Sequence, residues 1–239
     1  EQEGLQDYED LQGYFTNRVN AIIKKNGKKA ICWNDSLVAN NLDTDIQIQY
    51  WTVQHAEQFK AFAERGGEFI ISDMFHLYFD YPYAMTSLEK VFKYKQKPHI
   101  KNVDFSKYPG FLGLECCRWN EKELSNEQLE EMIFPRLNAL FSAETHYRIF
   151  EEQLEKTYGE AARRGLSYKP LLQCNPKGKA RREEVFAHMA AMNSDVDMST
   201  VKSSGNGVAE NKDFRKGFIK YFFKASDMPF MLKLIKGYR

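Results

Sequence analysis

The chain has 239 residues, and 43% of them are hydrophobic, which suffices for one large core or two smaller ones. Its 34 basic and 33 acidic side chains leave a net charge of +1, which gives no support to a nucleic acid or an anionic membrane as the main partner and favours a neutral substrate. No apolar stretch approaches the roughly 20 residues of a membrane span, and no signal-peptide pattern opens the sequence.

A helical pattern comes first in the chain. Apolar residues such as Leu11, Phe15 and Ile22 recur at spacings of three and four, which predicts an amphipathic helix over 5–26. Gly27 is its predicted C-terminal cap.

Short strand-like runs follow. In the second run Ile46, Ile48 and Tyr50 alternate with Gln47 and Gln49, so one face is apolar and the other polar. The predicted strands cover 29–33, 45–51, 68–72 and 110–117, with a helix over 55–65 and a long loop over 73–108. Ser125 and Gln128 form a predicted capping box that opens a helical region running with breaks to residue 164.

This alternation of strands and helices predicts an α/β fold with a parallel sheet. Four such units are half of a (β/α)8 TIM barrel. We therefore predict that 1–164 form half of such a barrel. Residues 165–239 are a predicted helical C-terminal extension, with a helix over 181–192, a polar stretch over 193–211 and an apolar, basic segment over 213–238.

The cysteines show no spacing typical of a metal site. They are Cys32, Cys116, Cys117 and Cys174, and no pair forms a CxxC motif, so we predict no metal and no cofactor. The first three fall within predicted strands, where unpaired thiols favour a reducing, cytoplasmic compartment.

Aromatic and acidic residues cluster at the ends of the predicted strands. Trp33 and Trp51 each end a strand, and Trp119 follows the fourth. Tyr78, Asp80 and Glu121 follow the third and fourth strands. Because active sites of such barrels lie at the C-terminal strand ends, rings and carboxylates there predict a site for a sugar, whose C–H faces stack on rings and whose hydroxyls need acceptors. Asp35 and Glu115, near the same strand ends, are expected to support these residues.

An ordered series of motifs carries a resemblance to a known family. It runs through DYEDLQGYFTNRV, KKAICWND, YW, LYFD, GLECCRWNE and FPRLNAL, over about Leu5 to Glu144. The series resembles glycoside hydrolase family 20, the exo-acting β-N-acetylhexosaminidases. In that family the substrate's own 2-acetamido oxygen attacks the anomeric carbon, so no enzyme nucleophile bonds to the sugar.

The resemblance implies a role for each strand-end residue. Tyr78 would hold the acetamido oxygen, and Trp33 and Trp51 would line the pocket of the acetamido methyl group. Trp119 would stack beneath the sugar ring. The substrate hydroxyls on the O6 and O4 side would be held by Asp80 and Glu121.

The family's acid, a Glu directly preceded by an Asp, has no counterpart here, because the chain contains no Asp-Glu dipeptide. The first helix resembles the family's segment between that pair and the fifth strand, so the resemblance implies that 1–164 form the C-terminal half of the barrel. We therefore expect a fragment that lacks this pair and is inactive alone, with N-acetylhexosamine-terminated glycans as ligands. Its open sheet edges predict self-association or pairing with the other barrel half. Two alternatives remain open: a non-catalytic N-acetylhexosamine-binding protein on the same fold, and a different (β/α)8 sugar hydrolase with convergent aromatic residues.

Overall fold

The structure is a computed structural model, and it describes residues 4–5, 7–101, 103–119, 124–194, 223–224 and 227. The chain forms two compact units: unit 1 comprises 1–74 and 97–115, and unit 2 comprises 75–96 and 116–239. The predicted boundary at residue 164 does not coincide with this division by packing, and it stays a prediction.

A parallel sheet forms the centre of unit 1. Its strands are β1 (Ile31–Trp33), β2 (Gln47–Tyr50), β3 (Phe69–Ile71) and β6 (Phe111–Leu114), and their order in the sheet is β1-β2-β3-β6. All neighbouring strands run parallel. The four strands that the sequence predicts are therefore confirmed, each a little shorter than expected.

The two faces of this sheet differ in polarity, as the alternation in the second strand predicts. On one face Tyr50 and Phe69 are buried against Phe59 of α2 (Ala56–Glu64), at ring-centroid distances of 4.8 and 5.1 Å. On the other face Gln47 donates to the Glu68 carboxylate at 2.7 Å. This arrangement leaves polar side chains on the face that α2 does not cover.

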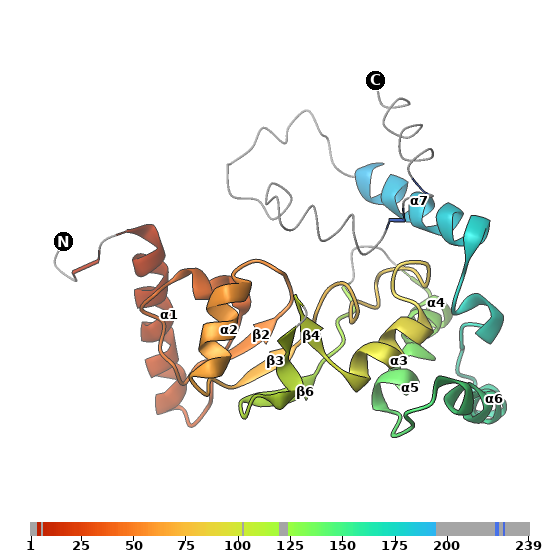
Figure 1. Cartoon of the computed structure of the whole chain (residues 1–239), viewed down its shortest axis with the longest axis horizontal. Helices are drawn as coiled ribbons and strands as arrows, with labels where there is room; N and C mark the ends of the chain where they lie inside the picture. The colour runs from red at the N-terminus through yellow and green to blue at the C-terminus, as the bar shows by residue number, and fades with distance from the viewer. Residues whose placement is uncertain are drawn as a thin grey trace. The chain divides into compact units, whose positions relative to one another are not determined.

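Helix α1 (Tyr8–Lys25) also belongs to unit 1 and lies alongside the sheet with α2 (Figure 1). The helix is confirmed, and Gly27 follows it with a positive φ of 67°, the conformation that a glycine cap permits. Its buried side is polar, however: Asn20 is almost fully buried and donates to Asp43 and Asp45. The apolar stripe that identified this helix in the sequence is exposed, with Phe15 at 67% and Ile22 at 61%.

The prediction of one long loop over 73–108 is wrong. This segment contains α3 (Leu88–Gln96), the antiparallel pair β4 (His99–Ile100) and β5 (Val103–Asp104), and the short helix η2 (Phe105–Lys107). Ser87 opens α3 by accepting the Lys90 amide on its hydroxyl. Leu88, Val91 and Phe92 are buried at helical spacing. This spacing is typical of a helix, but the aromatic cluster just before it led to the prediction of a loop.

The described part of unit 2 is largely helical. Its helices after α3 are α4 (Asn126–Ile133), α5 (Arg136–Phe141), α6 (Tyr147–Arg163), η3 (Leu171–Gln173) and α7 (Gly178–Ser194). The capping box of Ser125 and Gln128 is confirmed at α4, with both reciprocal hydrogen bonds present. The helical region to residue 164 is also confirmed, and α7 contains the predicted helix 181–192. Beyond residue 194 the structure describes only 223–224 and 227, so the predicted polar stretch and the last apolar segment lie outside the described residues.

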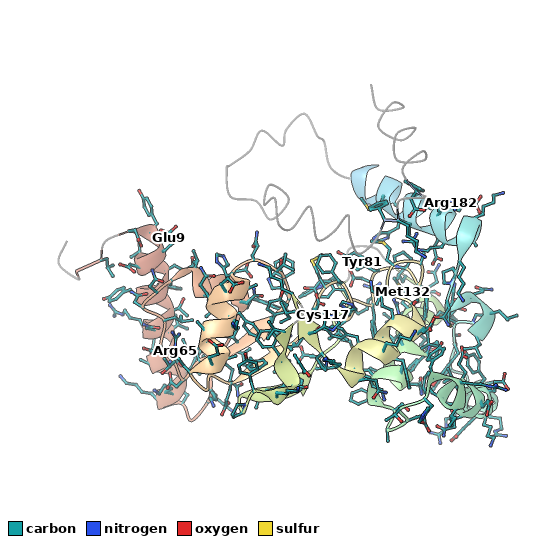
Figure 2. The ribbon with its side chains drawn as sticks, viewed as in Figure 1. Glu9, Arg65, Tyr81, Cys117, Met132 and Arg182 are labelled. Atoms are coloured by element: carbon teal, nitrogen blue, oxygen red, sulfur yellow. The ribbon has the colours of Figure 1, made fainter. Side chains whose placement is uncertain are left out.

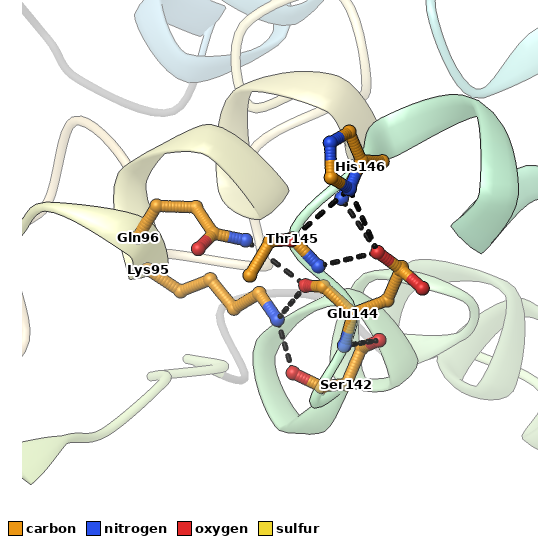
Figure 3. A network of polar contacts seen from close by, with 6 residues as sticks. All are labelled: Lys95, Gln96, Ser142, Glu144, Thr145 and His146. Carbon is orange, nitrogen blue, oxygen red and sulfur yellow. Dashed lines mark hydrogen bonds and ion pairs between the residues drawn. The ribbon is translucent and has the colours of Figure 1, made fainter.

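One apolar cluster holds the helices of unit 2 together. It contains residues of α3 and α6 together with neighbouring buried side chains, namely Phe79, Tyr83, Leu88, Val91, Phe92, Ala139, Phe150, Leu154 and Cys174. At its edge Lys95 donates to the carbonyls of Ser142 and Glu144 (Figure 3). This network joins the end of α3 to the segment that leads into α6.

Candidate functional site

In unit 1 the end of β1 is tied to the end of β2 by a buried amide. Asn34 follows Trp33 directly and is fully buried. Its Oδ1 accepts the backbone amide of Trp51 at 2.9 Å, and its Nδ2 donates to the carbonyls of Thr52 at 3.1 Å and Gln54 at 2.9 Å. The positions of the two strand-end tryptophans are thus linked through one side chain.

Asp35 fixes the ring of Trp51. The indole Nε1 donates to the Asp35 carboxylate at 2.5 Å. An indole has only this one polar hydrogen, so the contact sets the rotation of the ring. Asp35 thus holds a candidate site residue in place, as expected. Glu115 accepts from Gln49 at 2.7 Å, which is not a candidate site residue, so the supporting role expected of Glu115 stays a prediction.

In unit 2 Tyr78 is held by an isolated parallel bridge with Cys117. The Phe79 amide donates to the Cys117 carbonyl at 2.7 Å, and the Cys117 amide donates to the Leu77 carbonyl at 2.9 Å. Cys117 is labelled in Figure 2. The bridge gives Tyr78 a fixed backbone although no strand of the sheet contains it.

The phenol of Tyr78 lies beside Trp119. The two ring centroids are 6.0 Å apart at 59°, with Tyr78 buried and Trp119 43% exposed. Burial raises the pKa of the Tyr78 phenol, while a hydrogen bond with the Trp119 side chain lowers it in part. Because an indole N–H only donates, the phenol oxygen accepts in this hydrogen bond and the phenol hydrogen takes no part in it.

A buried arginine organises the loop that carries Asp80. Arg136 of α5 is fully buried and donates to the carbonyls of Phe79 at 2.6 Å and Tyr81 at 2.8 Å, the residues on either side of Asp80. It also donates to Thr86 O at 3.1 Å. The backbone around Asp80 is thus fixed from two sides by one guanidinium group.

Electrostatics in this part of unit 2 connect the same residues. Burial lowers the pKa of Arg136, and the charges of Tyr83 and Asp80 oppose that change. The guanidinium carbon also lies 4.7 Å from the ring centre of Phe79 and 4.2 Å from that of Tyr83. In the sequence, Arg136 is part of the FPRLNAL motif. Its apolar neighbours Pro135 and Leu137 are the one local indication that this arginine is buried.

The remaining residues singled out in the sequence are Glu121, a histidine and the cysteines. Glu121 lies outside the described residues. His76, which precedes Tyr78 by two positions, is buried and stacks on Tyr94 with ring centroids 4.0 Å apart. Among the cysteines, Cys117 and Cys174 are buried, whereas Cys32 and Cys116 are only half-buried, and none of these four described residues forms a disulfide.

Two further properties of the described residues bear on the class of site. No group of three or more His, Cys, Asp or Glu side chains gathers in this part of the chain as ligands of a metal ion would. None of the helices described here has the length and apolar character of a membrane span.

Comparison with known proteins identifies the family. The model of the glycosyl hydrolase family 20 catalytic domain matches residues 1–147, more than half of the chain. The chain belongs to glycosyl hydrolase family 20. Family 20 membership accounts for the ordered strand-end motifs, and it confirms the predicted resemblance.

The relatives within family 20 are much longer than this chain. A β-hexosaminidase of Vibrio vulnificus is 24% identical over 186 residues, which cover 63% of this chain and 22% of the relative. A β-hexosaminidase subunit beta of Entamoeba histolytica is 25% identical over 150 residues, 57% of this chain and 26% of that protein. The chain thus spans about a quarter of the length of these curated relatives.

Solved family 20 structures share the fold. The exo-β-N-acetylglucosaminidase of Vibrio harveyi in complex with N-acetylglucosamine superposes with a TM-score of 0.59 at 22% identity, over 71% of this chain and 29% of that one. The β-N-acetylhexosaminidase of Streptomyces coelicolor gives 0.57 at 22% identity, over 64% and 35%. The (β/α)8 fold class is therefore confirmed, with this chain forming part of the barrel.

Proposed function

We propose that the chain is the sugar-holding part of an exo-β-N-acetylhexosaminidase, which removes terminal non-reducing β-linked GlcNAc or GalNAc by substrate-assisted retaining hydrolysis. The observation that carries the proposal is the buried Tyr78 phenol beside the half-exposed Trp119 ring, on a backbone that the Cys117 bridge and Arg136 hold in place. Family 20 membership supplies the reaction class.

Tyr78 is the proposed positioning residue for the nucleophile. A phenol is protonated at neutral pH, and burial raises the pKa of Tyr78 further, so its hydroxyl can donate to the acetamido oxygen of the substrate. The carbonyl oxygen is then held for attack on the anomeric carbon, which makes the attack a pre-oriented intramolecular step. The new bond joins that oxygen to the anomeric carbon as the bond to the leaving group breaks, and water later opens the cyclic intermediate.

The remaining residues are proposed to bind the sugar. Trp33 and Trp51 line the pocket of the acetamido methyl group, and the hydrogen bond from Trp51 to Asp35 fixes one of these walls. Trp119 stacks on the pyranose ring. Asp80 and Glu121 accept hydroxyl hydrogens of the sugar, so a ligand that lacks these hydroxyls would be rejected.

The 239 residues contain no Asp-Glu pair, which this reaction needs to protonate the leaving oxygen. We therefore expect the isolated chain to bind the sugar without hydrolysing it. The same observation favours the second candidate, a protein that binds N-acetylhexosamine without cleaving it. An Asp-Glu pair in the complete protein supports the enzyme, and its replacement there supports the binding protein.

The proposed partners follow from the same site and from the sheet. The ligands are glycans that end in N-acetylhexosamine. Strand β1 is at one edge of the parallel sheet of unit 1, and an open edge pairs readily with a further strand. We propose that another part of the barrel, or a second copy of the chain, occupies this edge.

Binding by the isolated chain tests the proposal. Ligand-observed NMR with N-acetylglucosamine and with glucose measures whether the acetamido group is recognised. We expect contact at the acetyl methyl for the wild type, weaker binding for Trp119→Ala, and no change for Tyr8→Phe, a matched control whose ring is 88% exposed. Equal binding of glucose and N-acetylglucosamine would contradict the proposal.

Turnover by the complete protein tests the catalytic part. With a chromogenic N-acetylglucosaminide, Tyr78→Phe is expected to lower kcat about 10²-fold, because removal of one donor to a developing charge typically costs that much. Tyr8→Phe should leave kcat unchanged. Hydrolysis by the pure 239-residue chain that Tyr78→Phe abolishes would contradict the expectation that this part is inactive alone.

A further inference from the structure

A segment of unit 2 beyond the family match contacts the loop that continues from Tyr78 and Asp80. We name residues 81–89 the site loop and residues 174–188 the clasp segment. The family match ends at residue 147, so the clasp segment lies outside it. Both stretches belong to unit 2.

The end of the site loop is held at the start of α3. The Leu88 amide donates to the Cys174 carbonyl at 3.0 Å, and the Glu89 amide donates to Asn175 Oδ1 at 2.9 Å. The first amides of a helix have no partner within the helix, so Asn175 caps α3 from a distant part of the chain. Asn175 Nδ2 donates to the Tyr147 hydroxyl at 2.8 Å, which fixes the orientation of the capping amide.

The middle of the site loop is held by burial and by a carboxylate. Cys174 is fully buried in the same apolar cluster as Tyr83 and Leu88. Burial raises the pKa of the Glu184 carboxyl on α7, and hydrogen bonding with the backbone of Ala84 and Tyr83 offsets part of that rise. The clasp segment thus contacts both the end and the centre of the site loop.

The start of the site loop meets α7 through aromatic rings. His188 lies edge-on to Tyr81, with ring centroids 5.6 Å apart at 90°. The Tyr81 ring lies in turn 6.1 Å from the Tyr78 ring. Tyr81 lies on the side of unit 2 toward α7 (Figure 2).

We propose that the clasp segment is a positioning element of the candidate site: Asn175 and His188 fix the site loop and, through Tyr81, the setting of Tyr78. The effect of this positioning on sugar binding rests on the proposed function, whereas the ordering of the loop does not. Asn175 and His188 touch the loop rather than the ligand and act only through it.

Hydrogen exchange of the 239-residue chain, read by mass spectrometry, tests the ordering of the loop. Asn175→Ala and His188→Ala are expected to raise exchange about threefold to tenfold in peptides covering 79–89, the factor that corresponds to loss of one hydrogen bond or ring contact. Peptides of α2 in unit 1 should be unchanged. Asn175→Asp should restore protection of the Glu89 amide, because a carboxylate oxygen also accepts it.

Glu183→Gln is the matched control on α7, because Glu183 is exposed and pairs only with Lys179 of the same helix among the contacts described. It should leave loop exchange at the wild-type level. Unchanged exchange of 79–89 in both Asn175→Ala and His188→Ala would overturn the proposal. So would faster exchange throughout unit 2 with a lower Tm, because that pattern shows general loss of packing.

Measurement of sugar binding separates this inference from the proposed function. N-acetylglucosamine affinity should fall at least about threefold in His188→Ala while the Tm stays the same. If the wild type does not distinguish N-acetylglucosamine from glucose, the proposed function fails, and the exchange result still decides whether the clasp segment orders the loop. If the wild type does distinguish them and His188→Ala binds as tightly, the positioning role is wrong.

Discussion

Arg136 shows how a single residue can organise a site without touching a ligand. Its guanidinium is fully buried and donates to backbone carbonyls of the loop around Asp80, of Thr86 and of Met132. Carbonyl oxygens and ring faces offset the cost of burying this charge. The backbone geometry at Asp80 therefore depends on Arg136, which lies 56 positions further along the chain.

Arg136→Met is expected to lower the free energy of unfolding by about 3 kcal/mol, because several buried carbonyls lose a charged donor at once. Urea denaturation measures the change. Arg148→Met is the matched control, since Arg148 is 90% exposed and forms a surface pair with Glu152, and it should cost less than about 0.5 kcal/mol. Equal costs for both substitutions would show that the buried hydrogen bonds contribute little.

At the scale of elements, Glu144 connects α3 to α6. Its Oε1 accepts the amides of Thr145 at 2.7 Å and His146 at 2.8 Å, and its carbonyl accepts from Gln96 at 3.0 Å (Figure 3). The backbone hydrogen bonds from His146 and Thr145 lower the pKa of this carboxyl from its ordinary value of 4.5. Charged Glu144 thus favours the folded state.

The sign of the pH effect follows from that direction. A carboxyl whose pKa is lower in the folded state adds stability above its unfolded value near 4.5, and the gain disappears as pH falls through the folded value. Glu144→Gln should therefore lower Tm at pH 7, and the difference from the wild type should shrink below about pH 4. Thermal unfolding at both pH values measures this. Glu152→Gln, an exposed glutamate of α6, should show no such convergence.

At the scale of the whole molecule, α1 presents an apolar stripe to solvent. Leu11, Phe15, Val19 and Ile22 share this stripe at helical spacing, while the polar side of α1 binds the rest of unit 1. Unit 1 thus has an exposed apolar stripe on α1 and an open sheet edge at β1, and another barrel segment or a second copy can cover such surfaces. For the isolated chain the occupant we expect is a second copy.

Sedimentation velocity over a range of concentrations should show association of the isolated chain, and Phe15→Glu should weaken it at least about tenfold, because a charge would enter the buried contact. Leu172→Glu is the control, since Leu172 is 98% exposed and belongs to unit 2, whereas α1 belongs to unit 1. A chain that stays monomeric at all concentrations, or that dissociates equally in both variants, would contradict this expectation.

The amino-acid sequence alone determined the fold class and named the candidate site residues, whose roles stay predictions. Local signals sufficed where the chain forms short parallel strands, where Ser125 and Gln128 cap α4, and where Trp33, Trp51, Tyr78, Asp80 and Trp119 follow strands in family order. These features depend on neighbours in the chain, and residue patterns report them directly. The helix α3 was also visible in principle, through Ser87 and the spacing of Leu88, Val91 and Phe92.

Only the tertiary structure decided which distant groups hold these residues. Asn34 joins two strand ends, Arg136 binds carbonyls around Asp80, and the clasp segment reaches the site loop, and none of these contacts has a local pattern. The same holds for α1, whose periodicity gave the helix correctly but could not say which face is covered. Burial and hydrogen bonding between remote segments depend on the packing of the whole chain, and periodicity along one element carries no record of its partner.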